Sequence, residues 1–139
     1  MRLYNVFGRL QYKNVERFRV KWNAKCRSKI QFQVKAFMKK YWENHIVYEE
    51  FPVYGTRLKV DLLDATTKIA IEVQGRQHQE FNKHFHSNSR FKYLQSIKRD
   101  VKKSQWLEKN GFLLVEVMQD EAPTISESFF KDKYNITLV

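Results

Sequence analysis

The sequence predicts a single mixed α/β domain, and three observations support this. A chain of 139 residues is long enough for one hydrophobic core but not for two. Hydrophobic residues make up 42% of it, with only four Gly and two Pro, which excludes a disordered or low-complexity chain. Segments with helical spacing and short apolar runs follow one another in the order helix, three strands, helix, strand.

The first predicted element of the domain is an amphipathic helix over residues 28–44, with Ser28 as its N-cap. Two strands follow, over residues 45–55 and 56–64, and Gly55 marks the turn between them. A third strand over residues 66–75 follows a tight turn. These three strands can form an antiparallel meander.

A second helix is predicted over residues 87–110, because Phe91, Leu94, Ile97 and Val101 recur at helical spacing before Gly111. The nearly continuous apolar run at residues 112–117 is typical of a strand. Since a helix connects it to the third strand, we expect the two strands to be parallel. A short terminal helix is expected over residues 126–134.

Residues 1–29 are expected to form a basic N-terminal arm, and residues 30–139 the domain itself. Tyr12, Phe18 and Trp22 are interleaved with the cations of this segment. Such a segment suits phosphate contacts combined with base stacking or groove insertion. The alternative is an ordinary solvated segment whose aromatic residues pack on the domain. The arm residues expected to contact nucleic acid are Arg17, Arg19, Lys21, Lys25 and Arg27.

The charge balance indicates a polyanionic partner. The chain carries 26 Lys and Arg against 15 Asp and Glu, a net charge of +11, which favours nucleic acid over a basic structural protein. A single cysteine, Cys26, excludes an intrachain disulfide and a cysteine-based metal site. The sequence shows neither a membrane-spanning run nor a signal peptide. The expected location is a reducing compartment, cytoplasmic or nucleoid-associated.

Two acids, Asp61 and Glu72, lie on strands that a tight turn connects, so a hairpin can bring them side by side. Paired carboxylates are ligands that Mg²⁺ takes when water and a substrate phosphate complete its shell. The ion would then polarise a phosphodiester and acidify a bound water. Gln74 is two residues after Glu72, and its side chain therefore leaves the same face of the strand. The alternative is a pair of incidental surface acids.

His78 follows the third strand and is a candidate proton shuttle or water-orienting group. His84 and His86 lie nearby, but their spacing does not match a helical zinc pair. Asp100 stands among Lys and Arg residues of the second helix. By itself this pattern is typical of an exposed, ion-paired helix face.

Four pieces occur in a fixed order: "KVD" ending at Asp61, "IAIEVQGRQH" with Glu72 and His78, "DVKKSQWLEKNG" beginning at Asp100, and "FLLVEV". Together they resemble the very-short-patch-repair-like branch of the PD-(D/E)XK nuclease superfamily, which includes small phage and bacterial endonucleases and some homing endonucleases. The resemblance covers about residues 46–118. It implies a restriction-endonuclease-like fold and Mg²⁺- or Mn²⁺-dependent hydrolysis of DNA. Asp61 and Glu72 would be the metal ligands, and His78 and Asp100 would assist.

The chain departs from that pattern at two places. Gln74 occupies the position where the superfamily has Lys and this branch often has Asp, and an amide cannot act as a base. The family's first helix often begins with a Glu, whereas this chain has Gln31 or Gln33 there. Glu49 or Glu50 could take over that role.

The expected function is therefore that of a metal-dependent endodeoxyribonuclease, with duplex DNA as the foremost partner, no membrane partner, and a homodimer as one option. Two alternatives stay open: a DNA-binding protein on a catalytically degenerate nuclease fold, and a nuclease directed at junctions or RNA. Besides the arm, the residues expected to bind nucleic acid are Arg76, Arg99, Lys102 and Lys103.

Overall fold

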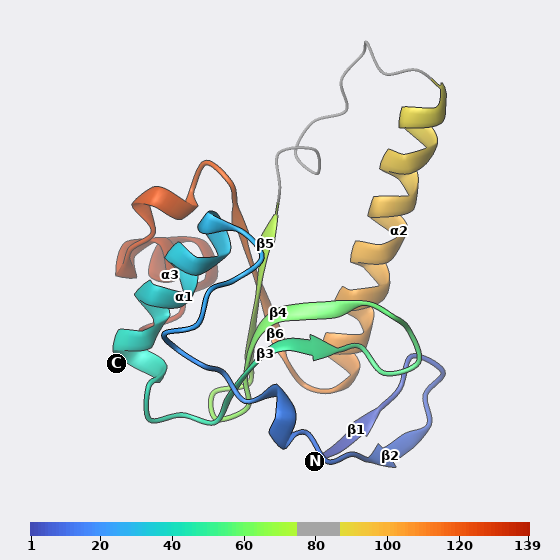
Figure 1. Ribbon diagram of the computed structural model, residues 1–139, viewed down its shortest axis with the longest axis horizontal. Helices are drawn as coiled ribbons and strands as arrows, with labels where there is room; N and C mark the ends of the chain where they lie inside the picture. Colours follow the sequence, from blue (N-terminus) through green and yellow to red (C-terminus); the bar gives the residue numbers. More distant parts are fainter. Residues whose placement is uncertain (75–86) are drawn as a thin grey trace.

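A four-stranded mixed sheet forms the centre of the computed structural model, which describes residues 1–74 and 87–139 (Figure 1). Its strand order is β3-β4-β5-β6. The strands are β3 (Val47–Pro52), β4 (Lys59–Asp64), β5 (Ile69–Gln74) and β6 (Leu113–Met118). The first three pair antiparallel, and β6 pairs parallel with β5. The expected meander with a strand added through a helical crossover is confirmed.

Three α-helices flank the sheet: α1 (Lys29–Trp42), α2 (Ser87–Lys109) and α3 (Glu127–Tyr134). The side chain of Ser28 caps α1 by accepting a hydrogen bond from the Gln31 backbone N–H at 3.1 Å, as the sequence predicts. A short 3₁₀ helix, η3 (Ala122–Thr124), precedes α3. No helix among the described residues has the length and apolar character that crossing a membrane requires.

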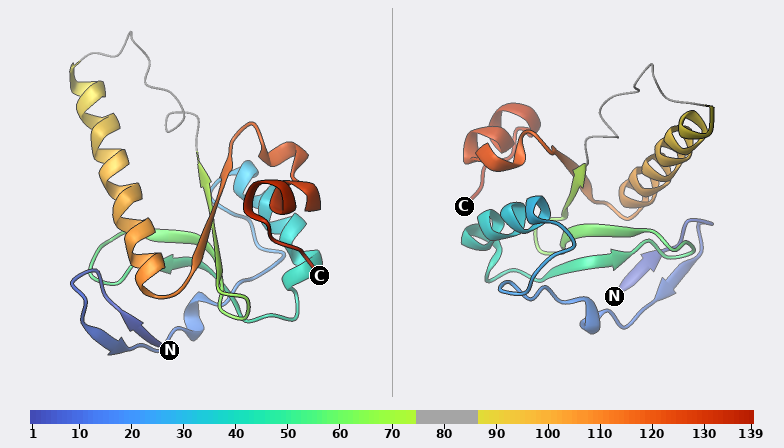
Figure 2. Two further views of the ribbon diagram at one scale, coloured as in Figure 1. Left: turned by 180° about the vertical axis from the view of Figure 1, so that it is seen from behind. Right: turned by 45° about the horizontal axis from the view of Figure 1, so that its top comes forward.

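Each face of the sheet carries its own hydrophobic cluster. Val34 and Met38 of α1 and Phe130 of α3 pack with sheet residues on one face. Trp106 and Leu107, near the end of α2, pack on the other. Figure 2 shows α1 and α3 together on one side of the sheet, with α2 on the other. Helix α2 therefore packs on the face of β4 and β5 that lies opposite α1 and α3.

The first 29 residues pack against this body. They contain the hairpin β1 (Arg2–Tyr4) and β2 (Leu10–Tyr12) and the 3₁₀ helix η1 (Glu16–Phe18). Leu3 and Val15 are buried in the cluster that also holds Trp106. Of the three aromatic residues expected in a basic arm, Phe18 packs edge-on against Phe51, Trp22 joins the opposite cluster, and Tyr12 remains 79% exposed.

Helix α2 has the range that its apolar repeat predicts, but most of that repeat is not buried. Phe91, Leu94, Ile97 and Val101 are 41–62% exposed. The reason is visible in Figure 1, where the N-terminal part of α2 projects away from the sheet and only its C-terminal end packs on it.

Candidate functional site

Asp61 and Glu72 are neighbours at the end of the β4–β5 hairpin. Leu62 pairs with Ile71 in the antiparallel ladder, so the next positions outward are Asp61 and Glu72. The ladder stops there, and the side chain of Asp61 continues it: its Oδ2 accepts a hydrogen bond from the Val73 backbone N–H at 2.8 Å. The expectation that this hairpin brings the two acids together agrees with the geometry.

Both carboxyl groups have raised pKa values. For Glu72, which is 5% exposed, burial raises the pKa well above the ordinary value, and the negative charge of Asp61 adds to that effect. Burial also raises the pKa of Asp61, although the hydrogen bond from Val73 and the charge of Lys103 act in the opposite direction. A buried carboxyl whose ionisation a neighbouring acid opposes is one that a cation would stabilise.

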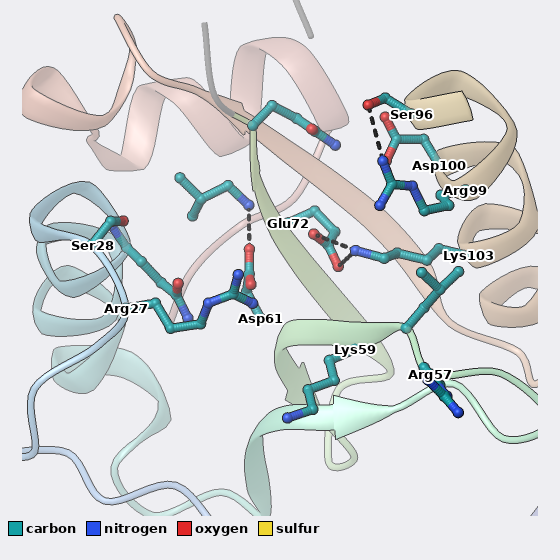
Figure 3. A pocket seen from close by; sticks show the side chains of 14 residues that line it. Arg27, Ser28, Arg57, Lys59, Asp61, Glu72, Ser96, Arg99, Asp100 and Lys103 are labelled. Carbon is teal, nitrogen blue, oxygen red and sulfur yellow. Dashed lines mark hydrogen bonds and ion pairs between the residues drawn. The ribbon is translucent and has the colours of Figure 1, made fainter. Parts of the chain in front are cut away.

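Lys103 of α2 supplies a positive charge to this pair. Its Nζ lies 3.3 Å from Oε1 and 3.4 Å from Oε2 of Glu72. Its side chain is only 18% exposed, so the ion pair is partly shielded from water. Figure 3 shows Lys103 reaching from α2 toward Glu72, with Asp61 beside them.

A pocket of about 710 Å³ opens over the acid pair. It lies between the start of α1, strands β4 and β5, and the middle of α2, and Gln74 also lines it. Among the described residues, its charged lining consists of five cations, Arg27, Arg57, Lys59, Arg99 and Lys103, and three acids, Asp61, Glu72 and Asp100. An excess of cations around the carboxylates of Asp61 and Glu72 suits an anionic substrate that approaches a metal ion.

Glu49 and Glu50, the two acids that could replace the missing Glu at the start of the first helix, have different partners in the structure. Glu49 turns to α1, where Lys35 Nζ lies 2.7 Å from its Oε2. Glu50 Oε1 accepts a hydrogen bond from Gln31 Nε2 at 2.9 Å. Gln31 itself lines the pocket, so Glu50 lies behind this amide of the pocket wall.

Glu50 also has an unusual backbone conformation. Its φ of 49° lies in the left-handed region, which is rare for a residue other than Gly, and it falls inside β3. The charge of Glu50 contributes to raising the pKa of Asp61. Arg27 partly offsets that charge, with Nη1 3.8 Å from Glu50 Oε2. Such strain beside a polar pocket is often associated with function.

The structure gathers part of the predicted site. Asp61, Glu72, Gln74 and Asp100 all line the pocket, as do three of the predicted nucleic-acid contacts, Arg27, Arg99 and Lys103. Lys102 lines a second, smaller pocket instead. The exposed residues Arg17, Arg19, Lys21 and Lys25 are not among the residues that line the main pocket. His78 and Arg76, together with His84 and His86, lie outside the described residues.

Several lining residues were not predicted as site residues: Ser28, Gln31, Arg57, Lys59 and Ser96. Two of them carry a signal in the sequence. Lys59 precedes Asp61 by two positions on one strand, and this spacing gives a shared face. Ser96 precedes Lys103 by seven positions on a helix, about two turns, so the two side chains lie on the same face of α2.

The acid pair fits a divalent cation that keeps several water ligands when it is bound. Among residues 1–74 and 87–139, no cluster of three or more His, Cys, Asp or Glu could hold a metal ion. Mg²⁺, however, is commonly bound by one or two carboxylates, with water and substrate phosphate in the other positions. Asp61 and Glu72 meet that requirement, whereas a fully protein-bound site does not exist in the described part of the chain.

No family model matches the chain. It is similar to uncharacterized protein 033L of Invertebrate iridescent virus 3, with 35% identity over 66 residues, which are 48% of this chain and 34% of that protein. It is also similar to uncharacterized protein 094L of Frog virus 3, with 38% identity over 66 residues, 48% of this chain and 43% of that protein. The chain thus matches less than half the length of either relative. No solved structure matches.

Proposed function

We propose that the protein is a Mg²⁺- or Mn²⁺-dependent nuclease that hydrolyses phosphodiester bonds of DNA. The observation that supports it most is the pair of buried Glu72 and half-buried Asp61 at the floor of a cation-rich pocket of about 710 Å³. Burying a carboxylate beside a second acid is costly unless a cation compensates the charge. A site that combines a cation-binding pair with surrounding Arg and Lys suits a phosphodiester.

In this proposal Asp61 and Glu72 hold the divalent ion. The bound ion would polarise the scissile phosphate and acidify the attacking water. Arg57, Lys59 and Arg99 line the same pocket and neutralise the phosphates on either side of the scissile one. Gln74 can hydrogen-bond a water or a phosphate oxygen through its amide.

In this proposal Lys103 takes the role of the lysine that the wider superfamily has at the position of Gln74. The ammonium group of Lys103 lies beside the second acid, with Nζ 3.3 Å from Glu72 Oε1. With Asp61 and Glu72 holding a divalent ion, the ammonium group of Lys103 would be placed to stabilise negative charge on the phosphate. The replacement at Gln74 is therefore compatible with an active enzyme.

A catalytically degenerate DNA-binding protein is the second candidate, and one observation favours it. Lys103 already supplies a positive charge to Glu72, so the acid pair has a partner without any metal ion. This candidate predicts salt-dependent DNA binding without cleavage.

The experiment that separates the two is nicking of supercoiled plasmid DNA with and without Mg²⁺ or Mn²⁺. We expect the wild-type protein to nick only with metal, and Asp61→Asn and Glu72→Gln to reduce the rate at least about 10²-fold. Glu108→Gln is the matched control, because Glu108 is an exposed acid on α2 that does not line the pocket. Nicking that persists in both site variants would refute the site, and metal-independent binding without nicking would favour the degenerate protein.

A further inference from the structure

The β1–β2 hairpin presents an apolar and aromatic face to solvent. Arg2 pairs with Tyr12 and Tyr4 with Leu10, so these four side chains share one face of the ribbon. Tyr4 is 40% exposed, Leu10 43% and Tyr12 79%. The opposite face carries Leu3, which is buried in the core.

A third aromatic residue stands at the tip of this hairpin. Phe7 is 82% exposed, although its backbone is held in place. The Asn5 side-chain Oδ1 accepts hydrogen bonds from the backbone N–H groups of Phe7 and Arg9 at 2.9 and 3.0 Å. The Val6 N–H donates to the Tyr54 carbonyl at 2.9 Å. A single exposed ring is common on protein surfaces, but an exposed apolar patch such as the one on this hairpin marks a binding surface.

The hairpin is also anchored to α2, so its aromatic side chains are presented on a rigid support. The Tyr4 backbone N–H donates to Asn110 Oδ1 at 2.8 Å, and the Tyr4 carbonyl accepts from Trp106 Nε1 at 2.7 Å. These bonds occupy the backbone of Tyr4 and leave its ring partly exposed. Rigid aromatic rings bind at a lower entropic cost than mobile ones.

The charges around the hairpin are positive. A pocket of about 230 Å³ between the tip and α2 is lined by Phe7, Lys102 and Lys109, and no Asp or Glu of the described residues lines it. Arg2 and Arg9 add two exposed cations on the hairpin itself. Aromatic rings among cations suit a strand whose bases stack while its phosphates are neutralised. A second copy of this chain would instead bring another net charge of +11 against the first.

The surface adjoins the candidate active site. Gly55 lines the small pocket and Arg57 the large one, and α2 contributes Lys102 to the first and Lys103 to the second. A nucleic-acid strand leaving the large pocket can therefore follow α2 and the β3–β4 connection to the hairpin.

We propose that the β1–β2 hairpin binds unpaired bases of a DNA strand by stacking on Phe7, Tyr4 and Tyr12. The inference rests on the proposed function, from which it takes DNA as the partner. It adds that the substrate contains single-stranded nucleotides beside the bond that is cut.

The test is binding of a fluorescently labelled single-stranded DNA oligonucleotide, measured by anisotropy without metal. We expect Phe7→Leu and Tyr12→Leu each to weaken binding about tenfold, and Tyr12→Phe to bind like the wild type. Phe91→Leu is the matched control, since Phe91 is 62% exposed but lies on α2 away from the hairpin. An abasic oligonucleotide of the same length should bind the wild type and the two leucine variants equally.

Three results would overturn the inference: unchanged affinity in both leucine variants, an equal loss on the abasic strand, or a wild-type dimer that Tyr12→Leu dissociates in sedimentation. These measurements record binding without cleavage. Their outcome therefore does not depend on whether the protein is an active nuclease.

Discussion

Glu72 has the most strongly perturbed environment at the scale of single residues. Burial and the neighbouring Asp61 raise its pKa well above the ordinary value of 4.5. A carboxyl group with a pKa that is higher in the folded than in the unfolded state favours folding when it is protonated. The metal-free protein therefore loses this contribution as the pH rises from about 4.5 toward the raised pKa.

Glu72→Gln should therefore become more stable relative to the metal-free wild type as the pH rises, because the amide carries no charge at any pH. We expect a melting temperature a few degrees above that of the wild type at pH 8, since roughly 1 kcal/mol corresponds to about 3 °C for a domain of this size. The difference should shrink as the pH falls toward 4.5. Thermal unfolding followed by circular dichroism in EDTA measures it, and a variant that melts below the wild type at pH 8 would contradict the pKa assignment.

Lys103 is the second residue on which the proposed nuclease activity depends. Lys103→Ala should slow single-turnover plasmid nicking by about 10²- to 10³-fold, because the charge beside the reacting phosphate is lost. Lys102→Ala is the matched control, since Lys102 is the adjacent cation on the same helix but lines the other pocket. It should change the rate at saturating DNA only a few-fold. If the two variants slowed nicking equally, Lys103 would contribute no more than an ordinary contact to a DNA phosphate.

The contrast between Asp61 and Lys103 shows which site residues a sequence can reveal. Asp61 and Glu72 lie on strands joined by a tight turn, and the register of a hairpin follows from its turn. The contact between Lys103 and Glu72 spans 31 positions. It depends on how α2 crosses the sheet, and no local pattern encodes that packing. The sequence therefore predicts Lys103 only as a nucleic-acid contact.

At the scale of elements, the β1–β2 hairpin depends on close packing at Gly55. A Cβ at this position would lie 2.7 Å from Val6 Cγ2, and the φ of Gly55 is 96°. Gly55→Ala should cost about 2 to 4 kcal/mol through overpacking and backbone strain together. Urea unfolding measures this loss.

Gly111 provides the matched control for this prediction. Its φ is also positive, at 80°, but no atom of the described residues outside its immediate neighbours lies within 4 Å of the place that a Cβ would take. Gly111→Ala should therefore cost only the strain, about 1 to 2 kcal/mol. Equal losses at the two glycines would show that the approach of the hairpin to the β3–β4 connection contributes nothing to stability.

The elements that can be predicted from the sequence are those with a regular apolar repeat or a helix-capping residue. Helix α1 combines an apolar stripe with the Ser28 cap, and the sheet strands are six residues long. Strands β1 and β2 have only three residues each, which is too short for alternation to be recognised. The apolar repeat of α2 predicted the helix but could not show that most of it projects beyond the sheet.

At the scale of the whole molecule, the fold concentrates charge where the acid pair lies. The net charge of +11 indicates a polyanion from the sequence alone. Folding adds the arrangement. In the part of the chain that the structure describes, five cations line one pocket with Asp61 and Glu72 at its floor, and they come from the segment before α1, the start of β4 with the connection before it, and α2. The mixed sheet makes this possible, because the helical crossover carries α2 over the end of the hairpin.

Asp61 and Glu72 are proposed to bind one divalent cation together, and a Mn²⁺ titration followed by electron paramagnetic resonance measures this binding. Bound Mn²⁺ is lost from the sharp signal of the free ion. We expect one site per chain in the wild-type protein at pH 8, abolished in both Asp61→Asn and Glu72→Gln and retained in Glu108→Gln. Wild-type protein that binds no Mn²⁺, or site variants that bind it as tightly as the wild type, would contradict the claim.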